Sequence, residues 1–204
     1  MYVGEDLSIY RATWLLIAVN LVAYIFTSIL SGNIVYMDTS VLAFLGQYNL
    51  YVIEHGAWWQ LFTAMFIHYT IGHIAFNMFF LFLLGVQFER LFGGQMLIKT
   101  YLFTGFLGNL MSLFLLPPYI VNVGASGAIF GIFGALIMFQ ARVGGNFRAT
   151  LMYGLFIVLI NSVMPNINFV AHVGGFIGGI ITGYYLSSRY LRYFTPYRYR
   201  ILTY

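Results

Sequence analysis

Several long runs of apolar residues, each close to the length that crosses a lipid bilayer, constrain this chain more than any other feature. A membrane-spanning helix needs about 20 predominantly apolar residues. Only 7% of the 204 residues are charged and 61% are hydrophobic, whereas soluble domains carry roughly 25% charged residues. Because so few charges cannot cover a soluble particle, the composition excludes a soluble enzyme, a nucleic-acid binder and a disordered chain. The sequence predicts an all-α, polytopic membrane protein that forms a single domain over residues 1–204.

The apolar runs divide into six predicted transmembrane helices. They cover residues 12–30, 70–90, 96–116, 124–141, 149–164 and 168–186. The third run stops at Pro117-Pro118, because proline cannot continue a helix, and Thr70 is a suitable N-cap for the second. The long loop between the first two helices, residues 31–69, is too rich in aromatic and aliphatic side chains to be simply hydrated. We expect it to lie in the membrane interface as short amphipathic pieces.

The basic residues indicate how these helices are oriented. Six spans place both termini on one side of the membrane, and all nine basic residues then fall on that side, whereas five or seven spans would scatter them. They are Arg11, Arg90, Lys99, Arg142, Arg148, Arg189, Arg192, Arg198 and Arg200. The positive-inside rule makes that side, with both termini, cytoplasmic.

A serine stands at the beginning of the predicted helix 124–141, in the motif Gly124-Ala125-Ser126-Gly127. In the predicted orientation Ser126 lies near the outer membrane surface. A helix N-terminus supplies unpaired backbone N–H groups and the positive end of the helix dipole. However, small residues also let helices pack closely, and the motif taken alone favours that packing role.

A histidine and three glycines share one face of the last predicted helix. Gly175, Gly179 and Gly183 recur every four residues, and His172 precedes the first of them by three. A strip without side chains lets another helix approach to backbone contact. If that helix is the one that begins at Ser126, the imidazole of His172 meets the serine hydroxyl. The alternative is an interfacial histidine that forms a hydrogen bond with a loop.

His73 and Asn77 lie four residues apart, on one face of the second predicted helix and near the same outer level. Two hydrogen-bond donors on one face could hold a developing oxyanion, or they could form a polar clamp between helices. Together with Ser126 and His172 they bring a nucleophile, a base and donors to one depth, as nucleophilic catalysis requires. The only nearby acidic candidate, Asp38, is in the loop, so the sequence predicts a Ser–His dyad without a carboxylate.

With these residues in view, the chain resembles the rhomboid family of intramembrane serine proteases over nearly its whole length. The G-x-S-G motif stands here as residues 124–127, and a histidine followed by small residues stands on the last helix as His172. The H-x-x-x-N motif stands as His73 and Asn77, preceded by a further histidine, His68. The resemblance implies a six-transmembrane-helix, rhomboid-like bundle.

The resemblance also implies roles and partners. Ser126 would be the nucleophile, His172 the general base, and His73, Asn77 and the Ser126 backbone N–H the oxyanion hole, while His68 would tie the loop to the site. Substrates would be transmembrane-anchored proteins cleaved near the outer end of their span, in a prokaryotic cell membrane. No metal, cofactor or nucleic acid is expected. The chain has no cysteine, which excludes disulfides and thiolate chemistry.

Three positions bear on how closely the chain follows this pattern. Gln60 stands where the family has an arginine that stabilises the loop, so we expect a less rigid loop. Phe130 replaces a tyrosine that packs on the catalytic imidazole, and the packing should survive. Glu89 is either an interface anchor or a structural contact.

Two other functions would leave different marks in the sequence. A catalytically inactive rhomboid-like protein that binds or chaperones transmembrane clients would be marked by loss of Ser126 or His172, and both are present. A transporter or channel would show a repeated half or charges at mid-membrane, and the sequence has neither. We therefore predict a serine endopeptidase.

Overall fold

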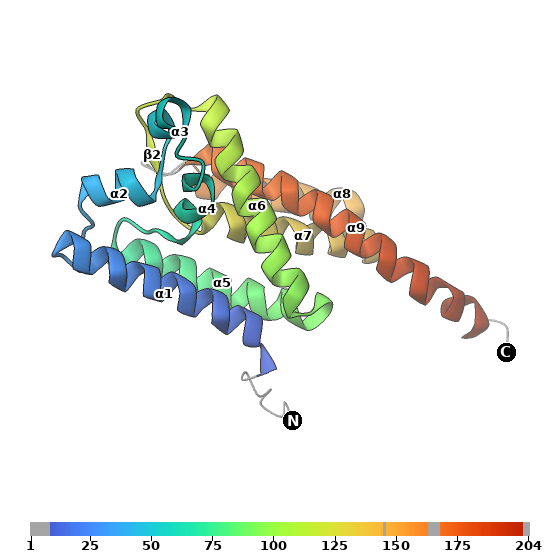
Figure 1. The fold of residues 1–204 in the computed structure, drawn as a ribbon. Helices are drawn as coiled ribbons and strands as arrows, with labels where there is room; N and C mark the ends of the chain where they lie inside the picture. The colour runs from blue at the N-terminus through green and yellow to red at the C-terminus, as the bar shows by residue number, and fades with distance from the viewer. Residues whose placement is uncertain (1–8, 145, 163–167, 202–204) are drawn as a thin grey trace.

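The computed structural model describes residues 9–144, 146–162 and 168–201. Six long helices make up most of this part of the chain (Figure 1). They are α1 (Arg11–Ser31), α5 (Ile71–Phe92), α6 (Gly94–Leu115), α7 (Ser126–Val143), α8 (Phe147–Ser162) and α9 (Phe169–Ile201). In the described residues all except α8 are long and apolar enough to cross a membrane, and the apolar part of α8, Phe147–Ile160, is shorter. The prediction of an all-α, polytopic membrane fold is confirmed.

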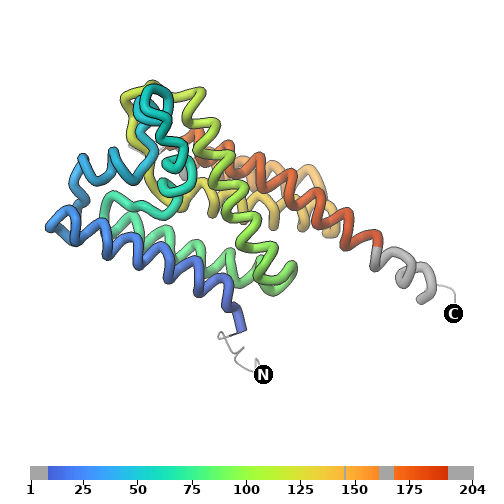
Figure 2. Tube along the Cα trace, viewed as in Figure 1, coloured from blue at the N-terminus to red at the C-terminus, as the bar shows by residue number. Residues whose placement is uncertain are grey.

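The predicted helix ends agree with the structure to within about two residues, with two exceptions. The predicted end of the fifth helix at Met164 lies outside the described residues. The last helix, expected to end near Leu186, continues to Ile201 (Figure 1). The first part of α9 runs beside α7 (Figure 2). The apolar pattern stops before the helix does, and Arg142 of α7 contacts α9 close to the predicted end. Its guanidinium donates to the Tyr184 carbonyl at 2.9 Å and to the Ser187 hydroxyl at 3.0 Å.

Residues between α1 and α5 fold into short elements that gather at one end of the bundle, here named the loop end (Figure 1). They are α2 (Thr39–Leu45), β1 (Gln47–Tyr48), α3 (Asn49–His55), α4 (Gln60–Thr63) and the 3-10 helix η2 (Ala64–Phe66). β1 pairs antiparallel with β2 (Val121–Asn122), with Gln47 opposite Asn122. Trp58 and Trp59 remain exposed, as expected of pieces that lie in a membrane interface.

Gln60 fastens this loop from within. Its side chain is completely buried. Its Oε1 accepts a hydrogen bond from the Tyr48 N–H at 2.8 Å, and its Nε2 donates to the carbonyls of Ala43 at 2.8 Å and Phe44 at 3.1 Å. The charge expected from the family pattern is absent, but three hydrogen bonds join α4 to α2 and β1 in its place. The expectation of a less rigid loop therefore finds no support here.

At the opposite end of the bundle, Glu89 of α5 caps α1. Its carboxylate accepts hydrogen bonds from the backbone N–H groups of Ala12 at 3.0 Å and Thr13 at 2.8 Å, and from the Thr13 hydroxyl at 2.7 Å. A carboxylate at a helix N-terminus satisfies unpaired N–H groups and complements the helix dipole. Of the two roles open for Glu89, the structure shows the structural contact.

The glycine strip of α9 packs directly on the backbone of α7. A Cβ atom placed on any of its three glycines would collide with a carbonyl oxygen of α7. Gly175 faces Gly127, Gly179 faces Gly131, and Gly183 faces Ala135. Because the facing positions on α7 also advance by four residues, the two helices stay in backbone contact for two turns. The predicted close approach of a helix to this strip is confirmed, and that helix is α7, so the beginnings of α7 and α9 lie together.

We expect Gly179→Leu to force α9 away from α7. Overpacking of a filled interior costs about 1–3 kcal/mol, and here the new side chain meets backbone that cannot turn aside. The melting temperature in detergent should fall by several degrees. Ile181→Leu places the same side chain on the same helix at an exposed position and should melt like the wild type. Equal melting temperatures for both variants would show that the close approach is not required.

Candidate active site

A serine and a histidine meet at the loop end of the bundle. Ser126 is the first residue of α7, and His172 lies in the first turn of α9. The imidazole Nε2 is 2.8 Å from the serine Oγ, although the two residues are 46 positions apart in the chain. His172 is only 5% exposed. A base within hydrogen-bond reach of a hydroxyl is the geometry that activates a serine nucleophile.

The turn before Ser126 is shaped to admit a second histidine. Gly124 has a positive φ of 128°, a conformation that side chains rarely adopt. A Cβ atom at Gly124 would lie 2.8 Å from His73 Nε2. Glycine therefore serves two purposes at this position: it permits the turn, and it leaves room for the His73 ring beside the backbone that carries Ser126.

Phe130 holds the face of the His172 ring. It follows Ser126 by one helical turn on α7, and its ring centroid is 4.4 Å from that of the imidazole, with an interplanar angle of 37°. The aromatic contact expected at this position is present. Because the two rings pack closely, the imidazole has little freedom to turn away from the serine.

His73 and Asn77 come to the same end of the bundle on α5. Thr70 is the N-cap of this helix, as predicted, and its hydroxyl accepts a hydrogen bond from the His73 N–H at 3.1 Å. Asn77 is 4% exposed, and its Nδ2 donates to the His73 carbonyl at 2.9 Å. The structure thus brings His73 beside the serine turn, whereas the observed bond of Asn77 is made within its own helix. A side-chain amide has a second N–H that can donate elsewhere.

His68 joins the loop to the serine turn. Its side chain is completely buried, its Nδ1 lies 3.3 Å from the Phe66 carbonyl, and its Nε2 accepts from the Ala125 N–H at 3.5 Å. The proton of the neutral ring is therefore on Nδ1. Burial lowers the pKa of His68 to about 3, with the neighbouring imidazole of His73 as the second cause. His68 contacts the residue before Ser126 without facing the hydroxyl.

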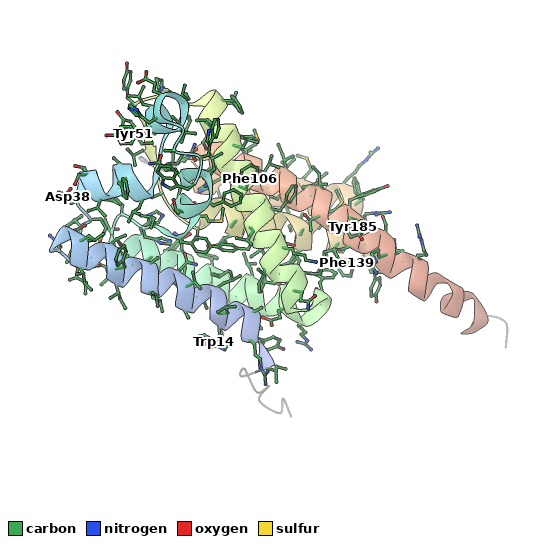
Figure 3. All side chains as sticks on the ribbon, in the orientation of Figure 1. Trp14, Asp38, Tyr51, Phe106, Phe139 and Tyr185 are labelled. Carbon is green, nitrogen blue, oxygen red and sulfur yellow. The ribbon has the colours of Figure 1, made fainter. Side chains whose placement is uncertain are left out.

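Two of the carboxylates that the structure describes, Asp38 and Glu89, form hydrogen bonds with residues outside this site. Asp38 is at the exposed beginning of α2 (Figure 3), where its Oδ1 accepts from the Ser40 N–H at 2.8 Å. Glu89 caps α1 at the far end of the bundle. Within the part of the chain that the structure describes, no group of three or more His, Asp or Glu side chains is arranged to hold a metal ion.

A group of polar side chains next to the site, all buried except the half-buried Asn168, was not predicted from the sequence. They belong to β1, β2, α3, α6 and the residue before α9, and are Gln47, Asn122, Asn49, Asn109, Ser112 and Asn168. One signal was available: Asn109 and Ser112 lie three residues apart, on one face of an apolar helix. The partners of these neutral residues come from distant parts of the chain, so their spacing alone did not indicate a network.

Fold and site together define a polytopic membrane protein that holds a serine–histidine pair at the loop end of its helix bundle. The sequence model of the Rhomboid domain matches residues 55–189. The chain belongs to the rhomboid family.

Relatives with similar sequences include two proteins of Bacillus subtilis (strain 168). The chain is 31% identical over 181 residues to "Putative rhomboid protease YdcA", covering 86% of this chain and 88% of that protein. It is 33% identical over 172 residues to "Rhomboid protease GluP", covering 82% of this chain but only 33% of that protein. It is also 34% identical over 137 residues to "RHOMBOID-like protein 1" of Arabidopsis thaliana, covering 64% of this chain and 35% of that protein.

The buried, neutral His68 predicts that acid destabilises the fold. Between pH 6.5 and about 3 the unfolded chain binds a proton at this residue that the folded protein does not bind. Stability contributed by His68 is therefore complete above pH 6.5 and is lost as the pH falls, by at most about 1.4 kcal/mol per pH unit. Glutamine can also accept from the Ala125 N–H, but it does not titrate.

The measurement is the melting temperature in detergent between pH 7.5 and 5. We expect a smaller decrease over this range for His68→Gln than for the wild type, because all other titrating groups are common to both proteins. Parallel curves would mean that His68 takes up no additional proton on unfolding.

Proposed function

We propose that this protein is an intramembrane serine endopeptidase that cleaves transmembrane-anchored proteins by a Ser126–His172 dyad. The observation that carries the proposal is the 2.8 Å separation of His172 Nε2 and Ser126 Oγ at the shared end of α7 and α9. The two Bacillus subtilis relatives named as rhomboid proteases support the reaction type.

In the first step His172 takes the proton of the Ser126 hydroxyl while the oxygen attacks the carbonyl carbon of the scissile peptide bond. The carbonyl oxygen becomes an oxyanion. His172 then gives its proton to the leaving amine, and the amino-terminal part of the substrate remains as an ester on Ser126. Water, deprotonated by His172, hydrolyses the ester and restores the free hydroxyl.

The oxyanion hole is the second part of the proposal. Ser126 begins α7, so its backbone N–H belongs to the first turn, where no intrahelical acceptor exists. The His73 ring lies against Gly124 on the same turn, and Asn77 has a second amide N–H beyond the one bonded to the His73 carbonyl. These three groups would donate to the oxyanion, and donors fixed before reaction stabilise it without reorganisation.

The substrate must present an extended segment, because a helix engages its carbonyls in its own hydrogen bonds. The site lies at the loop end, so cleavage should fall near the matching end of the substrate's transmembrane helix. The arginines at the start of α1 and the ends of α5, α7 and α9 lie at the other end of their helices. By the positive-inside rule the loop end faces outward and the termini are cytoplasmic. A prokaryotic cell membrane is the location that we propose with this orientation.

Ser126→Ala should abolish cleavage without unfolding the protein, since only a hydroxyl is removed from a helix start rich in small residues. The measurement is the appearance of cleaved products, by mass spectrometry, when purified protein in liposomes meets a library of single-span proteins. Ser28→Ala is the matched control: its hydroxyl bonds to the Tyr24 carbonyl within α1, and its activity should equal that of the wild type.

Cleavage by folded Ser126→Ala at the wild-type rate would refute the nucleophile. A rhomboid-like protein that only binds membrane clients gives a different result, because the wild type and Ser126→Ala would then capture the same clients and neither would yield products.

His73→Ala and Asn77→Ala should each lower kcat by about 10- to 1000-fold, since removal of one oxyanion donor costs about 3–4 kcal/mol in serine proteases. KM should change little, because the contact strengthens mainly in the transition state. A polar clamp between helices predicts the reverse pattern, a lower melting temperature with unchanged activity of the folded fraction. His55→Ala, in the exposed loop, is the control. If both variants kept the wild-type kcat, neither His73 nor Asn77 would be a donor of the oxyanion hole.

A further inference from the structure

Asn168 stands immediately before α9 and organises the turn that carries His172. Its backbone carbonyl accepts a hydrogen bond from the His172 N–H at 3.3 Å. Its side-chain Oδ1 accepts from the Ala171 N–H at 2.9 Å. A side-chain oxygen that binds the N–H of the third helical residue is an N-cap. Asn168 therefore fixes the backbone on which the imidazole is mounted.

The other half of the same side chain reaches the segment that carries Ser126. Nδ2 of Asn168 donates to Asn122 Oδ1 at 2.7 Å and to Ser112 Oγ at 2.8 Å. Asn122 lies in β2, four residues before Ser126, and Ser112 lies in α6. One amide thus connects three segments, and two of them carry the serine and the histidine.

The connection is anchored in a buried network. Asn122 is opposite Gln47 in the β1–β2 pair, and Gln47 Nε2 donates to Asn49 Oδ1 at 2.7 Å and to the Asn109 carbonyl at 2.9 Å. Asn49 in turn donates to the Ser112 carbonyl at 3.0 Å. A buried hydrogen bond adds only about 1 kcal/mol to stability, so stability alone is a weak reason for so many buried amides. Holding the segments in a single arrangement is a stronger one.

We propose that Asn168 is a positioning residue for the Ser126–His172 pair. The oxygen of its side chain fixes the first turn of α9, and its nitrogen ties that turn to β2, so that the imidazole and the hydroxyl stay in register. The expected effect on kcat rests on the proposed proteolytic function. The expected effect on the position of the imidazole rests on geometry alone. A displacement of about 1 Å between reacting groups can lower a rate about 100-fold.

Two substitutions separate the two roles of the Asn168 side chain, namely the N-cap bond to the Ala171 N–H (the cap) and the bond to Asn122 (the tie). Serine is as good an N-cap as asparagine, but it is too short to reach Asn122, so Asn168→Ser keeps the cap and loses the tie. Aspartate keeps both the cap and the length. Asn122 Nδ2 is buried without a hydrogen-bond partner, so a turned Asn122 amide can donate to the aspartate. Asn168→Asp should therefore restore what Asn168→Ser loses. Phe169→Ala changes the neighbouring exposed residue and is the control.

In the protease assay we expect Asn168→Ser to lower kcat about 10- to 100-fold with KM within about twofold of the wild type. Its melting temperature should stay within a few degrees. Asn168→Asp should regain most of the lost kcat, and Phe169→Ala should match the wild type. Wild-type kcat in Asn168→Ser, or a loss shared equally by the serine and aspartate variants and explained by melting temperature, would reduce Asn168 to an ordinary cap.

A second readout needs no catalysis. The chain has four histidines, so ¹⁵N-histidine NMR of the protein in detergent shows only four imidazoles. The Nε2 signal of His172 is assigned with His172→Gln, and Ser126→Ala gives its position without the serine bond. Asn168→Ser should move or broaden this signal toward the Ser126→Ala position, and Asn168→Asp should not. An unmoved signal in Asn168→Ser would overturn the positioning role. A moved signal with an inert wild-type protein would instead refute proteolysis and retain that role.

Discussion

The contact of α9 with α7 along a strip without side chains is the constraint on which the rest of this structure depends. In a bilayer, lipid tails are as apolar as the side chains of the helices, so helices associate by close packing and hydrogen bonds. The three glycines of α9 face carbonyl oxygens of α7 at successive turns, which fixes both the distance between the helices and their register. Register matters most, because Ser126 begins α7 and His172 lies in the first turn of α9, and a shift of one turn would separate them.

Packing sets the two helices side by side, and polar and aromatic contacts then fix the backbone and side chains at the ends where Ser126 and His172 lie. Phe130 limits the rotation of the imidazole, His68 holds the backbone before Ser126, and Asn168 holds the backbone before His172. These contacts come from different elements of the loop end. The loop is therefore part of the site's support, and the buried hydrogen bonds of Gln60 to α2 and β1 stabilise the site indirectly.

Features that repeat along the chain, or that stand at a helix end, could be predicted from the sequence. The apolar runs predicted the long helices, and Thr70 was correctly predicted as the N-cap of α5. The four-residue glycine spacing predicted a close helix contact, which the structure shows between α7 and α9. The partners of neutral polar residues could not be predicted from the sequence. The side chains of Gln60 and Asn168 form hydrogen bonds with residues such as Ala43, Ser112 and Asn122, which only tertiary folding brings near. The end of α9 was also wrongly predicted, because the apolar pattern used to define the helix stops near Leu186 while the helix continues to Ile201.

The arrangement also explains why several glycines and asparagines lie near the Ser126–His172 pair. A glycine at position 124 is required because the His73 ring occupies the space of a side chain, and at 175 because α7 does. Such residues bring backbone close, but they contribute few side-chain contacts to hold it there. Asparagine compensates, because a single amide both accepts and donates hydrogen bonds. In a bundle whose helices meet through small residues, the amides at the loop end supply the directional contacts that close packing alone lacks.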